Sequence, residues 1–384
     1  MLWKLLIRNA FRHKLRALLT VCGVAVAVLA FGLLSTLVDA WYAGVSAAAA
    51  NRLVIRHAIS LTFSLPIAYM EKIRAVDGVK AVSHMTWFGG IYVDRKNFFA
   101  NFAVDAKSFL DLYPEFVLPD DQKSAFLKDR KSCVVGRGLA ERFGWKVDST
   151  VTLQGTIYPG DWPMTVRGIY HGRDKSTDEN QLFFHWDYLN ERLKEHYPRR
   201  ANYAGIFVIE ISHADAAPAI AGAVDALFKN SLAETLTETE RAFQMGFVTM
   251  SEAILMAIRL VSLVIIGIIM AVVANTMIMS VRERLHEFAV LKTLGYGAFH
   301  LAFLILGESL AICAAGGALG IAGTFPALRV LAGYVGNIFP VLGISRATLG
   351  FDVLAVFAVA LVAAAFPVRR VVTIRIVDAL GRVE

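Results

Sequence analysis

Four long apolar stretches constrain the fold of this chain more than any other feature of its sequence. They are residues 17–38, 260–281, 293–328 and 353–368. About 20 helical residues are needed to cross the roughly 30 Å apolar core of a bilayer. The third stretch contains one carboxylate, Glu308. The fourth is short, so we expect it to begin near Leu349, with Asp352 at the membrane interface. The sequence therefore predicts four transmembrane helices.

The composition supports a membrane protein with one polar domain. The chain is 56% hydrophobic, whereas soluble domains are roughly 45–50% apolar. The excess lies in the four stretches, and the middle of the chain has the composition of a soluble domain. A net charge of +7 is typical of nucleic-acid binding, but basic residues beside transmembrane helices have a simpler explanation in topology. We therefore expect no nucleic-acid partner.

Lys and Arg near the ends of the stretches predict the orientation, because such residues are enriched on the cytoplasmic side. They gather before the first stretch, between the second and third, and after the fourth. These residues are Lys4, Arg8, Arg12, Lys14 and Arg16; Arg282, Arg284 and Lys292; and Arg369, Arg370, Arg375 and Arg382. We therefore expect both termini in the cytoplasm.

The first stretch could also belong to a cleaved signal peptide. Its basic flank fits both alternatives, but its apolar run is longer than that of a signal peptide, and no small-residue cleavage site stands out before Asp39. We expect it to be retained. Residues 1–16 carry apolar side chains at helical spacing between basic ones, which predicts a helix in the membrane interface, in contact with lipid. The alternative is a simple extension of the first transmembrane helix.

The predicted fold is an α-helical membrane protein with four transmembrane helices and one large α+β extracytoplasmic domain between helices 1 and 2. That domain covers residues 42–250, and its pattern allows two lobes, with residues 106–200 inserted. The four helices are expected at 17–41, 254–281, 298–328 and 349–368. A cytoplasmic segment, an external loop and a cytoplasmic tail are expected at 282–297, 329–348 and 369–384.

Within the external domain, alternating and amphipathic patterns predict strands and helices. Strands are expected at 91–93, 98–104, 150–153, 164–169 and 205–211. Helices are expected from 66 to 76, from 139 to 143 and, after Ser212, from 214 to 230.

The sequence predicts no catalytic site and no metal site. The histidines of the external domain are scattered, and its acidic pairs, such as Asp120 with Asp121, are expected in polar loops. No CxxC or HExxH pattern is present, and Cys133 is the one cysteine outside the apolar stretches. The chain also lacks GxxxxGK[ST], so it has no P-loop for ATP.

Residues 275–297 carry the strongest functional signal. After the second apolar stretch comes an amphipathic segment, with Leu285, Phe288, Ala289 and Leu291 on one side and Arg284, Glu287 and Lys292 on the other. It ends at Gly295, a residue favoured at helix C-termini. A short helix along the cytoplasmic surface can take force from a partner protein. A passive interfacial turn explains the composition equally well.

The same segment resembles the signature of a known family. Residues 281–295, VRERLHEFAVLKTLG, are similar to the V-x-E-R-x-x-E-I-G-I-L-K-A-L-G signature of FtsX-like permeases, the membrane subunits of MacB-type ABC systems, also called type VII or mechanotransmission transporters. Phe288-Ala289 replaces the usual Ile-Gly. Weaker resemblances lie at residues 8–16, at 134–153 in a MacB-like periplasmic core domain, and at 367–380. The FtsX-like domain is expected at about 258–378.

The resemblance implies a partner and a site. In such permeases the segment after the second helix docks on a cytoplasmic ABC ATPase dimer as a coupling helix. The residues in those positions are Arg282, Glu283, Arg284, Glu287, Phe288, Leu291 and Lys292. ATP and Mg would act on that separate ATPase chain, and this chain would bind no cofactor. A second copy of the permease and, for tripartite efflux, a periplasmic membrane-fusion adaptor are further expected partners in a bacterial inner membrane.

The resemblance also implies a function. The permease would transmit ATP-driven motion to its periplasmic domain, and so export or extract a lipid, lipoprotein, peptide or hydrophobic small molecule. A non-transport signalling subunit that regulates a periplasmic cell-wall enzyme is the alternative, although such members have external domains of roughly half this size. An adhesin or receptor without an ATPase would not need the coupling signature.

The third apolar stretch holds two further candidate sites. An ionisable residue inside a membrane is a functional hypothesis by default, and for Glu308 the alternatives are a proton relay or a structural pair with Arg or Lys of the coupling segment or tail. Gly316, Gly320 and Gly323 follow at spacings that let helix backbones approach closely. They fit packing within one protomer or across a homodimer.

Overall fold

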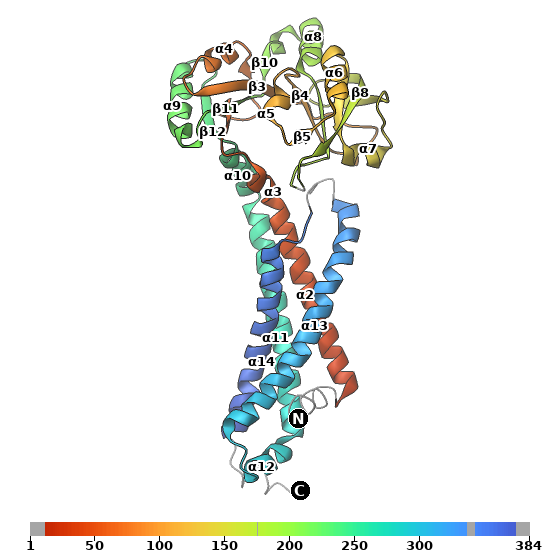
Figure 1. Ribbon diagram of the computed structural model, residues 1–384, viewed down its shortest axis with the longest axis vertical. Coiled ribbons are helices and arrows are strands. Elements are labelled where there is room, and N and C mark those ends of the chain that lie inside the picture. Colours follow the sequence, from red (N-terminus) through yellow and green to blue (C-terminus); the bar gives the residue numbers. More distant parts are fainter. Residues whose placement is uncertain (1–11, 175, 336–341, 374–384) are drawn as a thin grey trace. The chain divides into compact units, whose positions relative to one another are not determined.

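The computed structural model describes residues 12–174, 176–335 and 342–373, which fall into two compact units (Figure 1). Of the described residues, the helical unit contains 12–40, 251–334 and 342–373. The sheet unit contains residues 41–250 and Val335. Most of the expected interfacial helix, at 1–11, and of the expected tail, at 374–384, lies outside the described residues.

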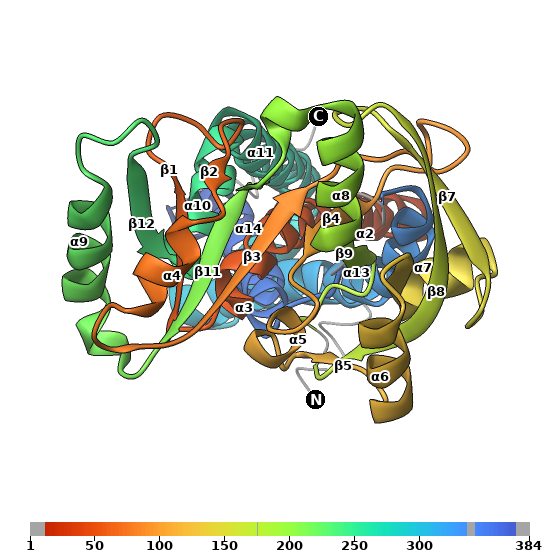
Figure 2. The same cartoon turned by 90° about the horizontal axis from the view of Figure 1, so that it is seen from above.

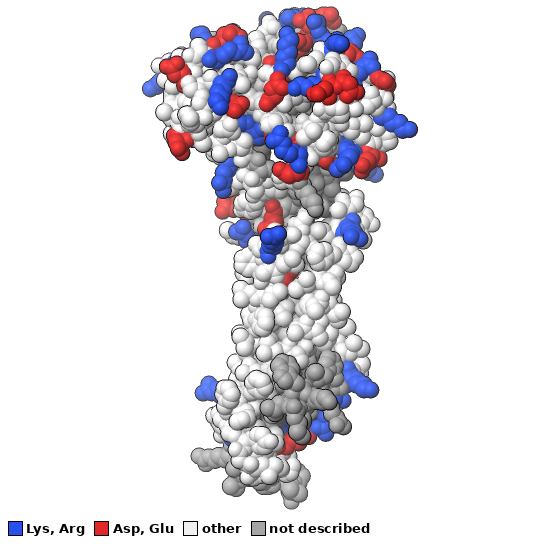
Figure 3. Space-filling view, viewed as in Figure 1, with Lys and Arg blue, Asp and Glu red and all other residues white. Residues whose placement is uncertain are grey.

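The helical unit is built on four long helices. They are α2 (Lys14–Trp41), α11 (Glu252–Glu283), α13 (Ala298–Val335) and α14 (Arg346–Thr373). Among the described residues, these four helices are long and apolar enough to cross a membrane, which confirms the predicted number. Charged side chains are sparse on their visible face between the two ends (Figure 3). Helix α13 continues through Pro326 to Val335, beyond the expected end at Leu328.

The four helices pack around a core of small and β-branched side chains. Val24 of α2, Val273 of α11, Cys313 of α13 and Ala360 of α14 are all at most 1% exposed and belong to one cluster. The opposite faces of these helices carry many exposed Leu, Ile, Val and Phe side chains. A helix that is apolar on both its packed and its exposed faces is suited to a lipid environment.

The sheet unit is organised by one mixed sheet, which has ten strands among the described residues. Its order is β12-β1-β11-β3-β4-β9-β6-β8-β5, with β7 paired to β8. The strands are β1 (Arg52–His57), β3 (Val79–Trp87), β4 (Ala100–Val104), β5 (Phe116–Val117), β6 (Ser132–Gly136), β7 (Thr150–Gly155), β8 (Gly160–Gly172), β9 (Gln181–His185), β11 (Ile206–Ile211) and β12 (Thr235–Thr239). The pairs from β12 to β4 are antiparallel, and β4–β9 and β6–β8 are parallel.

Short helices cover the sheet and connect its strands. They are α3 (Ala43–Ala47), α4 (Tyr69–Arg74), α5 (Phe109–Leu112), α6 (Asp120–Lys128), α7 (Arg137–Phe143), α8 (Trp186–His196), α9 (Ala217–Phe228), α10 (Glu240–Met250) and the 3-10 turns η1 (Pro198–Arg200) and η2 (Ala214–Ala216). A small hairpin pairs β2 (Leu65–Pro66) with β10 (Tyr203–Ala204). Helix α9 lies beside β12, and α4 lies beside β3 (Figure 2).

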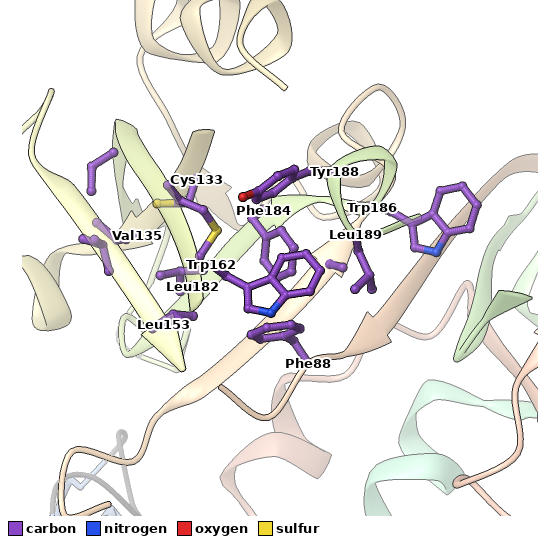
Figure 4. Packing of buried hydrophobic residues seen from close by; sticks show 14 of the residues in the cluster. Phe88, Cys133, Val135, Leu153, Trp162, Leu182, Phe184, Trp186, Tyr188 and Leu189 are labelled. Carbon is purple, nitrogen blue, oxygen red and sulfur yellow. The ribbon is translucent and has the colours of Figure 1, made fainter. Parts of the chain in front are cut away.

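The core of the sheet unit is rich in aromatic side chains. In the segment between β3 and β10, Phe88 packs edge-on against Trp162 and Phe184, at centroid distances of 5.2 and 5.1 Å (Figure 4). A separate aliphatic core lies under β1, β11 and α9. We call the segment of residues 88–202, which contains the expected inserted lobe, the insert.

The confirmed α+β fold differs from the expectation in detail. The predicted strand at 91–93 is wrong: Ile91 makes an isolated bridge with Gln154, and Val93 has a φ of +59°. Strands β1, β3, β9 and β12 were not predicted, and Asp120 and Asp121, expected in a loop, form the first turn of α6. Four consecutive residues at the start of β1 are buried, so this strand has none of the apolar–polar alternation by which a half-buried strand is recognised.

Candidate functional site

The expected coupling segment forms a short helix, α12 (Leu285–Thr293), directly after α11. The chain leaves α12 through Gly295, whose φ of +88° suits glycine. The amide of Gly295 donates to the Lys292 carbonyl, and that of Tyr296 donates to the Leu291 carbonyl. This hydrogen-bond pair is a Schellman motif, which ends the helix and returns the chain to α13.

One face of α12 is packed into the helical unit. Phe288 is 2% exposed and lies in a cluster with Val281, Leu301 and Ile305, and Leu291 packs against the same cluster. The amphipathic pattern therefore identified the buried face. Phe288 and Leu291, both expected to contact the ATPase, hold α12 in place in this structure.

Arg284 and Glu308 form a buried ion pair behind α12. The Nη1 atom of Arg284 donates to Oε2 of Glu308 at 2.9 Å, and both side chains are 10% exposed. Ser280 donates to the second carboxylate oxygen at 3.1 Å. The structure thus contains the pairing with the coupling segment that was one alternative for Glu308. Removing one partner of such a pair leaves a buried charge without a counter-charge, which lowers the free energy of unfolding by about 3–5 kcal/mol.

The two acidic residues of the signature bind basic residues at the start of the first transmembrane helix, Arg12 just before α2 and Arg16 in its first turn. Arg16 forms a two-pronged contact with Glu283, at 2.7 and 2.9 Å. Arg12 donates to Glu287 at 2.6 Å, and Arg284 donates to the same carboxylate at 2.9 Å. The hydrogen bond from Arg12 is the main reason that the pKa of Glu287 is lowered. The start of the first transmembrane helix is therefore joined to α12 through Arg12 and Glu287, and to the end of α11 through Arg16 and Glu283.

The remaining signature residues take different positions. Lys292 donates through Nζ to the Val372 carbonyl, near the end of α14, at 2.9 Å. Arg282 is exposed at the end of α11. An outward stripe, not among the expected contact residues, consists of His286 and Val290 of α12 and Leu294 just after it, at four-residue spacing and all exposed. The spacing of four residues is visible in the sequence, but which face of the helix is buried is not.

The three glycines of α13 pack against α2 of the same chain. A Cβ on Gly320 would lie 2.6 Å from the Ala25 carbonyl oxygen, and one on Gly316 would lie 2.6 Å from Val24. Gly323 would approach Leu29 to 3.0 Å. These positions correspond to packing within one protomer, one of the two alternatives.

Two further acidic residues of the helical unit were not proposed as sites. Oδ2 of Asp39, near the end of α2, accepts hydrogen bonds from Ser345 at 2.8 Å and Thr348 at 2.6 Å. Asp352, in the second turn of α14, is 1% exposed, and neither carboxylate oxygen has a hydrogen-bond partner in the structure. Among the described residues, no group of three or more His, Cys, Asp or Glu is arranged to hold a metal ion.

Comparison with protein families matches two parts of the chain. Residues 17–227 match the family described as "MacB-like periplasmic core domain", and residues 259–376 match "FtsX-like permease C-terminal". No match was found among the curated proteins.

Two of the solved structures similar to this chain are an extracellular domain and a periplasmic region of other proteins. One is the extracellular domain of the noncanonic ABC-type transporter YknZ from Gram-positive bacteria, 16% identical, with a TM-score of 0.36, covering 49% of this chain and 99% of that one. Another is the periplasmic region of MacB from Actinobacillus actinomycetemcomitans, 11% identical, with a TM-score of 0.37, covering 51% and 92%.

Proposed function

The chain belongs to the ABC transporter permeases that combine a MacB-like periplasmic core domain with an FtsX-like permease domain, and from this premise we propose that it couples ATP hydrolysis by a separate ATPase to motion of its periplasmic domain. FtsX-family permeases work with an ABC ATPase, and no ATPase domain is found among the family matches. The substrate proposed is a lipid, lipoprotein, peptide or hydrophobic small molecule, exported or extracted from the periplasmic side.

The arrangement of α12 is the observation that supports this proposal best. The helix is anchored on its inner face by Phe288 and behind by the Arg284–Glu308 pair. A helix held in this way transmits a push to the transmembrane helices instead of tilting freely. Its outer face is free for a partner, and there we place the ATPase contact, on the stripe of His286, Val290 and Leu294. Both termini then lie in the cytoplasm, on the same side as α12.

The ion pairs at the start of α2 connect the first transmembrane helix to α12 and to the end of α11. Arg12 and Arg16 bind Glu287 and Glu283, so a displacement of α12 also pulls on the start of the first transmembrane helix. Helices α2 and α11 lead in sequence to the two ends of the periplasmic domain. Motion that enters at α12 therefore has a direct covalent route to both ends of that domain.

Co-purification of a co-expressed ABC ATPase with the permease tests the docking site. Val290→Arg places a charge in the outward stripe, and we expect recovery of the ATPase with the permease to fall about tenfold. Leu232→Arg, on a fully exposed residue of the sheet unit, is the matched control and should leave recovery unchanged. Equal recovery with both variants would refute the assignment of the docking site.

ATP hydrolysis then tests transport against signalling. If the permease–ATPase complex hydrolyses ATP continuously in lipid nanodiscs, with a rate that rises on adding a periplasmic adaptor or lipid substrate, export or extraction is supported. Stimulation by a periplasmic cell-wall enzyme alone would favour the signalling alternative.

A further inference from the structure

A buried arginine lies where several parts of the sheet unit meet. Arg52 is the first residue of β1, and its side chain is 5% exposed. Its Nε atom donates to Glu240 at 2.8 Å, and its Nη atoms donate to the two oxygens of Glu115 at 3.0 and 2.6 Å. Nη1 also donates to the Leu112 carbonyl at 3.1 Å, and the ring of Tyr113 lies 4.2 Å from the guanidinium carbon. Arg52 therefore uses all three of its nitrogen atoms.

The partners of Arg52 come from separate parts of the chain. Glu240 is the first residue of α10, the helix that precedes α11 in the sequence. The same Oε2 atom of Glu240 accepts a hydrogen bond from the Ala49 amide, in the link between α3 and β1. Glu240 thus joins the two chain segments that lead to the transmembrane helices. Leu112 and Glu115 belong to the insert, so Arg52 connects both segments to it.

Packing alone would hold these parts together less specifically. Apolar residues of the insert, including Phe183 and Phe109, already share a core with Val208 of β11. Apolar contacts are non-directional and allow two parts to slide or roll. A guanidinium fork bound to a carboxylate at both oxygens fixes direction as well as distance. Burying charged groups contributes little to stability. We therefore expect this cluster to fix the orientation of the insert relative to the two chain segments that lead to the transmembrane helices.

We propose that Arg52 is a positioning residue that makes the two membrane connections and the insert move as one piece. This inference rests on the proposed function, because it describes how motion arriving from the transmembrane helices would reach the far part of the periplasmic domain. Without the clamp, α3 and α10 would still move with the helices that they continue, but the insert would follow loosely.

A distance measurement in the full chain with its ATPase tests this. Spin labels on cysteines at Glu141, in α7 of the insert, and at Met250, at the end of α10, report motion between the insert and the membrane connection; both positions are well exposed. Cys22, the exposed native cysteine, is replaced by alanine. Distances are recorded by pulsed electron paramagnetic resonance in nanodiscs, with and without a non-hydrolysable ATP analogue.

Arg52→Lys keeps the charge but removes the fork. In the unmodified chain we expect a narrow label-to-label distance distribution that is the same with and without nucleotide, because the clamp makes the two labelled parts move together. In Arg52→Lys we expect the distribution to become about twofold broader and to change with nucleotide, because the insert is no longer held in direction. ATP hydrolysis should stay within about twofold of the unmodified chain, since the coupling helix is untouched. Arg56→Lys is the matched control: Arg56 lies on the same strand but pairs with Glu238 of the neighbouring β12, and its variant should behave as the unmodified chain.

The outcomes separate this inference from the function on which it rests. A distance that changes with nucleotide in the unmodified chain, or an Arg52→Lys distribution as narrow and as unchanging as that of the unmodified chain, refutes the clamp and leaves the proposed function standing. ATP hydrolysis by the ATPase that is the same with and without the permease overturns the proposed function, and with it the clamp. If Arg52→Lys does not reach the membrane, Glu115→Gln, which keeps the hydrogen-bond acceptor on a partly exposed side chain, carries the same prediction and the same refutation.

Discussion

Arg284 Nη1 lies 2.9 Å from Glu308 Oε2, and this pair joins the end of α11 to the interior of α13. Arg284 is also the residue at which the chain changes from α11 to α12. The pair therefore fixes the helix that we propose takes force from the ATPase. Because both side chains are buried, we expect the contribution of each residue to stability to depend on the presence of the other.

The first prediction concerns this pair. Glu308→Leu leaves the buried Arg284 with its more exposed contact to Glu287 alone, and we expect it to destabilise the protein by about 3 kcal/mol, the lower end of the range for a broken buried pair. Arg284→Met should cost a similar amount for the same reason. In the double variant no charge is left unpaired, so much of the stability should return. Unfolding midpoints of the four proteins in detergent measure the coupling, and additive losses would contradict it.

The proton-relay alternative for Glu308 has a separate test. In Glu308→Gln the side-chain oxygen can still accept a hydrogen bond from Arg284, but the amide cannot take up and release a proton. With a structural pair, ATP hydrolysis by the permease–ATPase complex keeps its pH profile. Loss of activity, or a changed profile, at unaltered stability would support the relay.

The second prediction is a pH dependence of the periplasmic domain. Burial lowers the pKa of His84, although Asp105 and Asp187 oppose the shift, and burial also lowers the pKa of His185. These histidines stay neutral in the folded state while the unfolded chain binds protons near pH 6.5. Stability is therefore fully present above about pH 6.5 and declines as the pH falls below it.

Tryptophan fluorescence during thermal unfolding at pH 7.5 and pH 5.5 measures this effect. Trp186 packs edge-on against His84, at 4.8 Å between ring centroids. His84→Phe should reduce the loss of melting temperature at pH 5.5. It should also raise the melting temperature at pH 7.5, because neither ring nitrogen of His84 has a hydrogen-bond partner in the structure. The unpaired His213, which is exposed, offers a control: His213→Phe should leave the pH dependence unchanged.

The coupling helix and its membrane support were largely predictable because they depend on local periodicity. Helical spacing identified the face that buries Phe288 and Ala289. Arg284 was assigned to the polar side, and it is buried instead, because Glu308 lies within reach to neutralise it. That correction needs the distance between two helices, which periodicity does not contain.

The Arg52 cluster could not be predicted in this way. Its partners Glu115 and Glu240 lie 63 and 188 positions away in the sequence. No spacing rule relates residues so far apart, and β1 itself, buried from its first residue, lacks the alternation of a half-buried strand. The pairing follows from the mixed sheet, in which β1 lies between β12 and β11.

The third prediction concerns the contact between α2 and α13. A methyl group at Gly320 would lie 2.6 Å from the Ala25 carbonyl oxygen, a backbone atom that can move only with its helix. Gly320→Ala should therefore destabilise the protein by about 1–3 kcal/mol. Gly333→Ala, on the same helix with open space around the added carbon, is the control and should be neutral. A variant that lowers the dimer fraction without lowering the melting temperature would point to packing across a homodimer.

The fourth prediction contrasts two aspartates of the helical unit. Asp39 accepts hydrogen bonds from Ser345 and Thr348, so Asp39→Ala should cost about 1–3 kcal/mol by leaving these hydroxyl groups without their acceptor. Asp352 has no such partner, and an ionised carboxylate buried between transmembrane helices is unfavourable. Asp352→Asn keeps the shape and removes the charge, so we expect unchanged or higher stability.

Melting temperatures in one detergent, compared at pH 6 and pH 8, separate these two effects. The Asp39→Ala loss should be present at both pH values. Asp352→Asn should melt at the same temperature as the unmodified chain, or at a higher one, at both pH values. A marked loss of stability in Asp352→Asn at both pH values would mean that the carboxylate has a binding partner in the working protein, and ATP hydrolysis by the complex would show whether that partner belongs to the transport cycle.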